Sequence, residues 1–96
     1  MLVVRRLIWN PLNIGHIARH EVTPEEVEEV CHGDPVVQVG KQGRSLVFGP
    51  TQSGRMLMVV IDPESGEMGV YYPVTARPAS RRERAIYAGE RGGDIE

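Results

Sequence analysis

The feature that most constrains the fold is a run of β-type segments in the second half of the chain, separated by short turns. Because connections this short join antiparallel neighbours, the pattern predicts an antiparallel four-stranded meander. The segment from Met56 to Ile61 is apolar on both faces, which predicts a central strand. Pro73 cannot donate to a ladder, so it should lie at an edge or a bulge. The expected strands are residues 36–40, 44–49, 55–61 and 67–75.

Two helix starts precede this region. Asn10 is followed by Pro11, which pairs an N-cap with proline at the first helical position. The first helix should run to about residue 20, with Ile14, Ile17 and Ala18 facing the core.

The second helix start follows at once. Thr23 is an N-cap, Pro24 takes the first helical position, and Glu26 completes a capping box. Gly33 should close this helix. Its inward-facing residues are predicted to be Val27, Val30 and Cys31.

The two ends of the chain complete the predicted fold. Residues 2–9 are rich in β-branched and large apolar side chains and predict an N-terminal strand. Ser80 and Glu83 form a capping box that starts a C-terminal helix near Arg81. The fold class is therefore α+β, with an N-terminal strand, two short helices, the meander and a C-terminal helix, and with the helices on one face of the sheet. We expect one domain over residues 1–88 and a flexible tail over residues 89–96.

The composition of the chain indicates the cellular compartment in which the protein is expected. No run in the sequence approaches the roughly 20 apolar residues of a membrane span, and the start lacks the order of a signal peptide. The single cysteine, Cys31, excludes an intramolecular disulfide and fits a reducing compartment. We therefore expect a cytoplasmic protein with no membrane partner.

The charge of the chain is unevenly distributed. The net charge of −2 is unlike that of a typical nucleic-acid-binding domain. However, six acids and no Lys or Arg lie between Glu21 and Asp34, whereas four bases and one acid lie between Arg77 and Arg84. A ligand meets the local field rather than the sum, so the basic segment remains a candidate anion-binding surface.

The basic segment has a defined geometry. Pro78 disfavours a helical conformation for Arg77, which should stay extended at the exit of the last strand. Arg81, Arg82 and Arg84 follow in the first turns of the helix. They are either part of a phosphate-binding surface or simply a solvated helix face.

Two motifs lie at opposite ends of the chain. The first is Trp9-Asn10-Pro11 with the segment IARHEVTPEEV from Ile17 to Val27, and the second runs from Arg44 to Pro50, through Gly54-Arg55, to TARPASRRER and Tyr87. Together, these motifs resemble the BrnT family of bacterial toxins. The resemblance covers most of the chain, from Trp9 to Tyr87. One departure is Arg19-His20-Glu21 where the family has a Lys-His-Gly run; arginine cannot exchange a proton near neutral pH.

The resemblance implies a RelE-like fold and a specific biology. It implies the toxin of a type II toxin-antitoxin system, an endoribonuclease that cleaves mRNA without a metal or other cofactor and arrests growth. It also implies a small DNA-binding antitoxin encoded beside it, whose complex with the toxin represses their operon. The oligomer would be a homodimer or a toxin-antitoxin hetero-oligomer.

Metal-free RNA cleavage needs a base, an acid and cations around the phosphate. His20 is the candidate base or acid, because an unperturbed imidazole titrates near pH 6.5, and Glu83 or Tyr87 is the second proton-handling group. Arg77 and Arg81 would hold the scissile phosphate. The candidate RNA-binding residues are Trp9, Arg19, Arg44 and Arg55, with Trp9 or Tyr71 stacking a base.

Each of these residues also has a structural interpretation. His20 can cap carbonyls at a helix end, and Glu83 is explained by its capping box. Trp9 can belong to the core, and Arg44 and Arg55 can serve solubility alone.

Two further hypotheses come from other functional classes. His16 and His20, with Cys31 and His32, could supply zinc ligands, but Cys31 belongs to the apolar stripe, so we expect no metal site. Alternatively, the protein is a catalytically inactive toxin-like module that acts with an antitoxin in transcriptional autoregulation, its acidic helix from Glu25 to Glu29 facing a basic partner segment.

Overall fold

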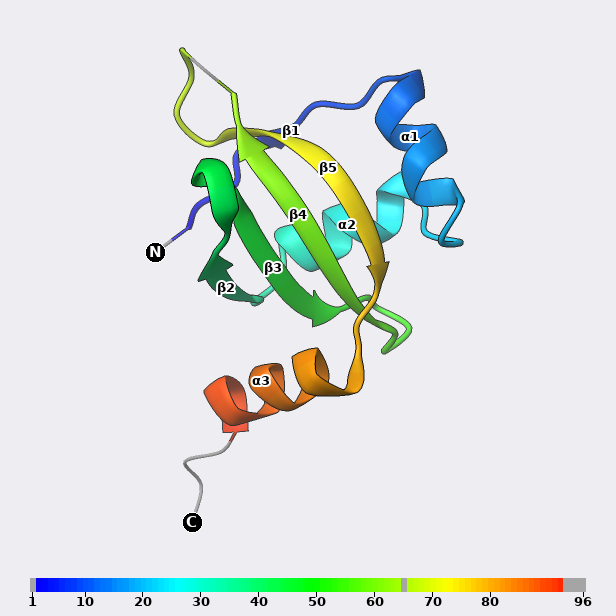
Figure 1. Ribbon diagram of the computed structural model, residues 1–96, viewed down its shortest axis with the longest axis vertical. Helices are drawn as coiled ribbons and strands as arrows, with labels where there is room; N and C mark the ends of the chain where they lie inside the picture. Colours follow the sequence, from blue (N-terminus) through cyan, green and yellow to red (C-terminus); the bar gives the residue numbers. More distant parts are fainter. Residues whose placement is uncertain (1, 65, 93–96) are drawn as a thin grey trace.

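Five strands form one mixed sheet in the computed structural model, which describes residues 2–64 and 66–92 (Figure 1). The strand order is β1-β5-β4-β3-β2; β1 is parallel to β5, and every other pair is antiparallel. The elements are β1 (Arg6–Leu7), α1 (Pro11–Ala18), α2 (Pro24–Cys31), β2 (Val36–Val39), the 3-10 turn η1 (Lys41–Gly43), β3 (Ser45–Pro50), β4 (Met56–Pro63), β5 (Val70–Pro78) and α3 (Arg81–Gly92).

The antiparallel meander from β2 to β5 is confirmed, and so is the α+β class. The central position of β4 is also confirmed. Pro73 lies beside the register shift between Val60 and Ile61, as its missing N–H requires. The sheet nevertheless has five strands rather than four, because β1 joins it in parallel.

The predicted strand over residues 2–9 is wrong in its extent, because only Arg6 and Leu7 form ladder pairs with β5, while Ile8 adds one backbone hydrogen bond to Tyr71. The amides of Arg5 and Arg6 both donate to the carbonyl of Gly69, at 2.7 and 3.2 Å, which interrupts a regular ladder. Leu2 and Val4 instead pack against the core without pairing.

α1 begins as predicted but buries a different stripe. Asn10 and Asn13 form a reciprocal capping box, and Ile17 is fully buried. Ile14 and Ala18 are exposed, which corrects the predicted stripe. Asn13 takes the inward position, because its amide donates to the carbonyls of Ile8 (2.9 Å) and Pro73 (3.1 Å). This contact holds α1 at the outer edge of β5.

The sheet has an apolar cluster on each side. On one side, here called the α2 face, Ile17 of α1 and Val27 and Val30 of α2 pack on a cluster that includes Leu57 and Val59 of β4. The other side, the α3 face, carries Val36, Phe48 and Met58, which pack against Ile86 and Tyr87. The prediction that all helices share one face is therefore wrong for α3. Successive residues of β4 point to opposite sides of the sheet and are apolar on both, so each side must be covered by packed helices.

α3 starts at its predicted capping box. The amide of Glu83 donates to Ser80 Oγ at 3.2 Å, and the amide of Ser80 donates to Glu83 Oε1 at 2.8 Å. The helix continues past residue 88 to Gly92, and residues 93–96 of the predicted tail lie outside the described residues. No helix in the described ranges has the length and apolar character to cross a membrane.

Candidate functional site

The strongest polar contact at the predicted site joins Arg77 to Glu83. Arg77 Nη1 and Nη2 contact Glu83 Oε1 and Oε2 at 2.9 and 2.8 Å, a two-pronged arrangement. Nη1 also donates to the carbonyl of Pro78 at 3.2 Å. Arg77 stands opposite Met58 in the ladder, so its side chain lies on the α3 face. The Arg77–Glu83 pair, here called the Arg77 clamp, therefore ties the end of β5 to the first turn of α3.

This contact controls the ionisation of both groups. The hydrogen bonds from Arg77 hold the pKa of the Glu83 carboxyl below its ordinary value, although partial burial opposes the shift. The same bonds raise the pKa of the Arg77 guanidinium. Glu83 is thus a carboxylate near neutral pH, and it is poorly suited to donate a proton.

A hollow between α1 and β5 brings a second group of predicted residues together. His16 comes from α1, Arg19 is the residue that caps the end of α1, and Tyr72 and Thr75 come from β5. Arg19 is exposed, and its side chain has no hydrogen-bond or ion-pair partner within residues 2–64 and 66–92. The remaining residues around the hollow are Pro11, Leu12, Asn13, Gly15 and Val74.

One residue that lines this hollow, Thr75, lies close to Arg77 along β5. Thr75 and Arg77 are two residues apart on one strand, so their side chains share the α3 face at a spacing of about 7 Å. The ring of His20 meets the ring of His16 edge-on, with centroids 6.1 Å apart. Among the described residues, however, no hydrogen bond, ion pair or hollow joins His20 to Arg77. His20 reaches this surface only through His16.

The arginines of α3 differ in their contacts. Arg81 and Arg82 are exposed and unpaired within the part of the chain that the structure describes. Arg84 donates to the carbonyl of Ala79 at 2.9 Å. Arg81 and Arg82 thus offer two free cations in the first turn of the helix, beside the Arg77 clamp.

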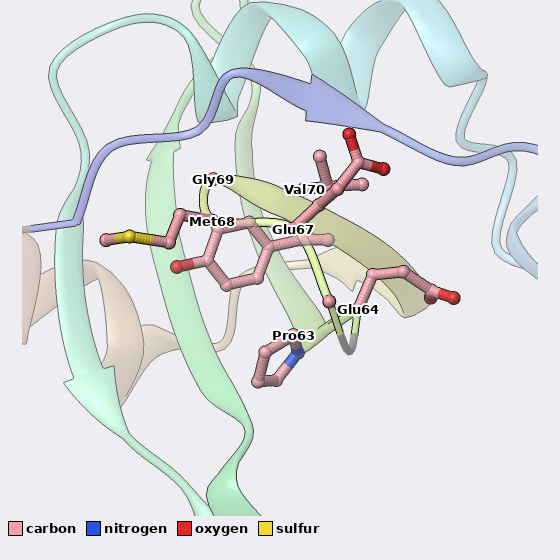
Figure 2. A pocket seen from close by; sticks show the side chains of 8 residues that line it. Pro63, Glu64, Glu67, Met68, Gly69 and Val70 are labelled. Carbon is pink, nitrogen blue, oxygen red and sulfur yellow. The ribbon is translucent and has the colours of Figure 1, made fainter.

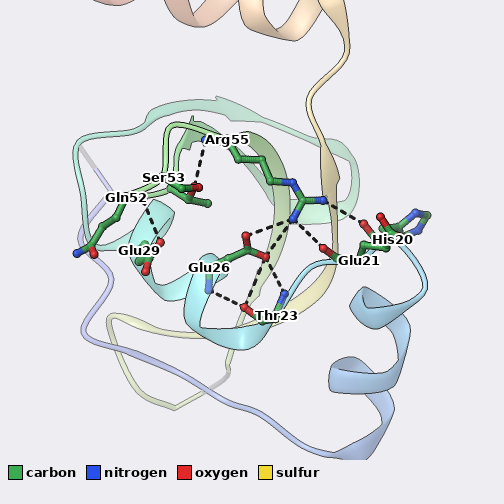
Figure 3. Close-up of polar contacts among 9 residues, drawn as sticks. His20, Glu21, Thr23, Glu26, Glu29, Gln52, Ser53 and Arg55 are labelled. Atoms are coloured by element: carbon green, nitrogen blue, oxygen red, sulfur yellow. Dashed lines mark hydrogen bonds and ion pairs between the residues drawn. The ribbon is translucent and has the colours of Figure 1, made fainter.

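Arg55 is engaged on the opposite side of the sheet (Figure 3). Its guanidinium bonds Glu26 at 3.1 Å and donates to the backbone carbonyls of Glu21 (2.7 Å) and His20 (3.3 Å). Figure 3 shows the His20 imidazole pointing away from this guanidinium. Arg55 therefore braces the turn between α1 and α2.

Trp9 is also tied into the structure. Its indole N–H donates to Glu28 Oε2 at 2.9 Å, and its ring packs against the α2-face cluster. Glu28 Oε1 lies 3.2 Å from His32 Nδ1. The sequence could not reveal this Trp9–Glu28–His32 contact, because residue 9 and residue 28 meet only in the folded chain.

The remaining predicted residues lie elsewhere. Arg44 Nε lies 3.7 Å from Asp62, which offsets its charge. Tyr87 packs on the α3-face cluster and lines a hollow with His32, Glu29 and other residues. Tyr71 packs on the α2-face cluster, so Tyr72 is the tyrosine at the α1–β5 hollow.

A further hollow lies beside the β4–β5 connection and is shown in Figure 2. Pro63, Met68 and Tyr71 give it apolar walls. It contains none of the candidate catalytic residues, so it is separate from the surface described above.

No metal site forms within the described residues, where no group of three or more His, Cys, Asp or Glu side chains could hold an ion. Cys31 is buried, and desolvation, with Glu28 nearby, raises the pKa of its thiol to about 12. A thiol in this state is a poor metal ligand.

No protein-family model and no curated protein matches this sequence.

The structure thus sorts the candidate residues into separate groups. Arg77 and Glu83 bond each other at the β5–α3 junction, with Arg81 at the start of α3, while Arg19 and His16 line the neighbouring hollow beside β5. His20 lies against His16, outside the lining of this hollow. Sequence reasoning missed Tyr72 and Thr75 as parts of this surface. The sequence shows that side chains alternate between the two sides of β5, but it does not show that α1 lies beside that strand.

Proposed function

We propose that this protein is the toxin of a type II toxin-antitoxin system, a metal-independent endoribonuclease of the BrnT type with a RelE-like fold. The observation that carries the proposal is the row of groups along β5. Arg19 and His16 line one end of the row with Tyr72 and Thr75, and Arg77 lies at the other end. Unpaired guanidinium groups, imidazoles and a tyrosine ring are the groups that contact phosphates, protons and bases in single-stranded RNA.

In this proposal the arginines have two different roles at the RNA phosphates. Arg19, Arg81 and Arg82 have no internal partner in the described ranges and would contact the RNA backbone. Arg77 uses three N–H contacts internally, on Pro78 and Glu83, of the five that a guanidinium carries. Its remaining N–H groups would stabilise charge developing on the scissile phosphate.

His16 of α1 and His20, two residues past the end of α1, would carry the proton transfers. Cleavage begins when a base takes the proton of the ribose 2′-hydroxyl, and an acid then protonates the leaving oxygen. His16 lines the hollow, and the ring of His20 lies edge-on to it with the centroids 6.1 Å apart, so two imidazoles, the side chains most often used for general acid and base catalysis, are available beside the hollow. The carboxylate of Glu83 then orients Arg77 rather than transferring a proton.

The proposal is tested by induced expression in a bacterium, with growth and RNA integrity as readouts. Arg19→Ala is the sharpest variant, because the Arg19 side chain has no hydrogen bond or ion pair to lose within the described residues, and we expect about 10- to 10³-fold slower cleavage. Lys41→Ala is the matched control, since Lys41 is also an exposed cation but lies on η1. Purified protein should cleave RNA equally well with and without a chelator. Absence of both arrest and RNA loss would refute the proposed function.

One observation favours the alternative, an inactive toxin-like module in transcriptional autoregulation. Arg77 is held by Glu83, and no carboxylate partners the His20 imidazole among the described residues. This alternative predicts normal growth on expression, together with binding to a small DNA-binding protein encoded beside it. Co-expression with the neighbouring reading frame and an operator-binding assay separate the two proposals.

A further inference from the structure

The outer edge of β2 is an open pairing surface. β2 is the last strand of the sheet and pairs only with β3 among the described strands. The amide of Gly40 donates to the carbonyl of Arg44 at 2.8 Å, and this pair continues the β2–β3 register. Because backbone groups alternate in an antiparallel ladder, Gln38 faces β3 while Val37 and Val39 direct their N–H and C=O groups outward.

β2 itself carries neither a charge nor a bulge, two features that usually prevent pairing, and the neighbouring Leu2 and Glu90 lie only at its first half, around a hollow with Val36 and Val37. Val39 is 92% exposed and Val37 is 38% exposed, and no residue from 35 to 40 is charged. No hydrogen bond from another element reaches the outward groups of Val37 or Val39 within residues 2–64 and 66–92. Native edge strands are normally blocked by charges, bulges or a covering element.

The sequence of the edge is complementary to itself. We propose that β2 pairs antiparallel with β2 of a second copy, about a two-fold axis at Gln38, to form a continuous sheet across a homodimer. In this register Val37 of each copy stands opposite Val39 of the other. Both outward residues then form hydrogen-bonded pairs, and the two valine side chains meet on the α2 face.

The residue pattern of β2 selects a second copy as the partner. Positions 37 and 39 are both valine, so the register about Gln38 places an identical apolar side chain opposite each outward residue on both sides of the axis. In the same register Lys41 stands opposite Pro35, so the contact places no like charges opposite each other.

Sedimentation or light scattering over about 10 μM to 1 mM tests the contact, because one short strand from each copy should give a concentration-dependent dimer. We expect Val39→Lys to remain monomeric, since a charge on the strand blocks pairing. Met68→Lys is the control, because Met68 is also a highly exposed apolar residue (88%) but lies on the β4–β5 connection. A monomeric parent protein, or a Val39→Lys dimer, would overturn the proposal.

Cysteine cross-linking tests the register. Across the two-fold axis the two copies of residue 38 form a non-hydrogen-bonded pair with Cα atoms about 4.5 Å apart, within disulfide range. The two copies of residue 39 lie diagonally, beyond about 7 Å. Gln38→Cys should therefore cross-link under mild oxidation and Val39→Cys should not, while buried Cys31 stays unreactive. The reverse result, or no cross-link at residue 38, would refute this pairing.

Discussion

Arg77 and Glu83 join the last strand to the last helix through two parallel contacts of 2.9 and 2.8 Å. Ser80 lies between them and exchanges capping bonds with Glu83. The carboxylate thus serves the helix cap and the arginine at once. This arrangement makes Glu83 a structural centre of the segment that carries the proposed RNA contacts.

Replacing Glu83 by glutamine should separate its two roles. Glutamine keeps the capping box but removes the charge that faces Arg77. We expect Glu83→Gln to lower the free energy of unfolding by about 1–2 kcal/mol at pH 7, as measured by urea denaturation. Glu64→Gln is the control, because Glu64 is exposed and its side chain has no ion pair in the described ranges. Equal stabilities of the two variants would contradict the clamp.

The contribution of Glu83 should also depend on pH in one direction. Its folded pKa lies below the ordinary 4.5, so the unfolded chain binds the proton more readily between the two values. The stabilisation is therefore complete above the unfolded pKa and is lost as the pH falls through the folded pKa. Unfolding free energies of the parent protein and Glu83→Gln, compared between about pH 2 and 7, should converge in acid. A gap that stays constant across this range would contradict the assignment.

Arg55 should matter for stability more than for RNA contact. Its guanidinium reaches Glu26 and the carbonyls of His20 and Glu21, and Glu21 has a positive φ of 60°. Arg55→Lys supplies one compact charge and cannot reach all these acceptors at once. We expect Arg55→Lys to cost about 1 kcal/mol and Arg55→Ala about 2 kcal/mol in thermal or urea unfolding. RNA cleavage per folded molecule should be unchanged, and a selective loss of cleavage would return Arg55 to the RNA-binding surface.

The local signals in the sequence predicted the structure well. The capping boxes at Thr23 and Ser80 form as expected, because each depends on residues three positions apart. The short turns fixed the meander for a similar reason. The side of the sheet that α3 covers could not be read in this way, since β4 is apolar on both sides and either side could receive a helix.

The candidate site depended on contacts between distant segments. Asn13 bonds the carbonyl of Pro73, sixty residues away, and this contact brings Arg19 and His16 beside β5. The partners of Arg55 are likewise 29 to 35 residues away in sequence. Sequence patterns showed which arginines and histidines were available, but tertiary contacts decided which of them have free charges.

Gly69 provides a test of how β1 is held. It has a φ of +82°, and a Cβ added there would lie 2.7 Å from Cγ and 2.8 Å from Cδ of Arg5. Gly66 has a similar φ of +91° but open space around it. Gly66→Ala should therefore cost about 1 kcal/mol from the backbone alone, whereas Gly69→Ala should cost about 2 kcal/mol or more in urea unfolding.

The excess cost at Gly69 should depend on the side chain of Arg5. Truncation by Arg5→Ala removes Cγ and Cδ, the two atoms that a new methyl group would meet first. In that background, the extra destabilisation of Gly69→Ala over Gly66→Ala should largely disappear, and a double-mutant cycle measures the difference. If the excess persists without the Arg5 side chain, its cause lies in the backbone at Gly69, whose carbonyl accepts the amides of Arg5 and Arg6.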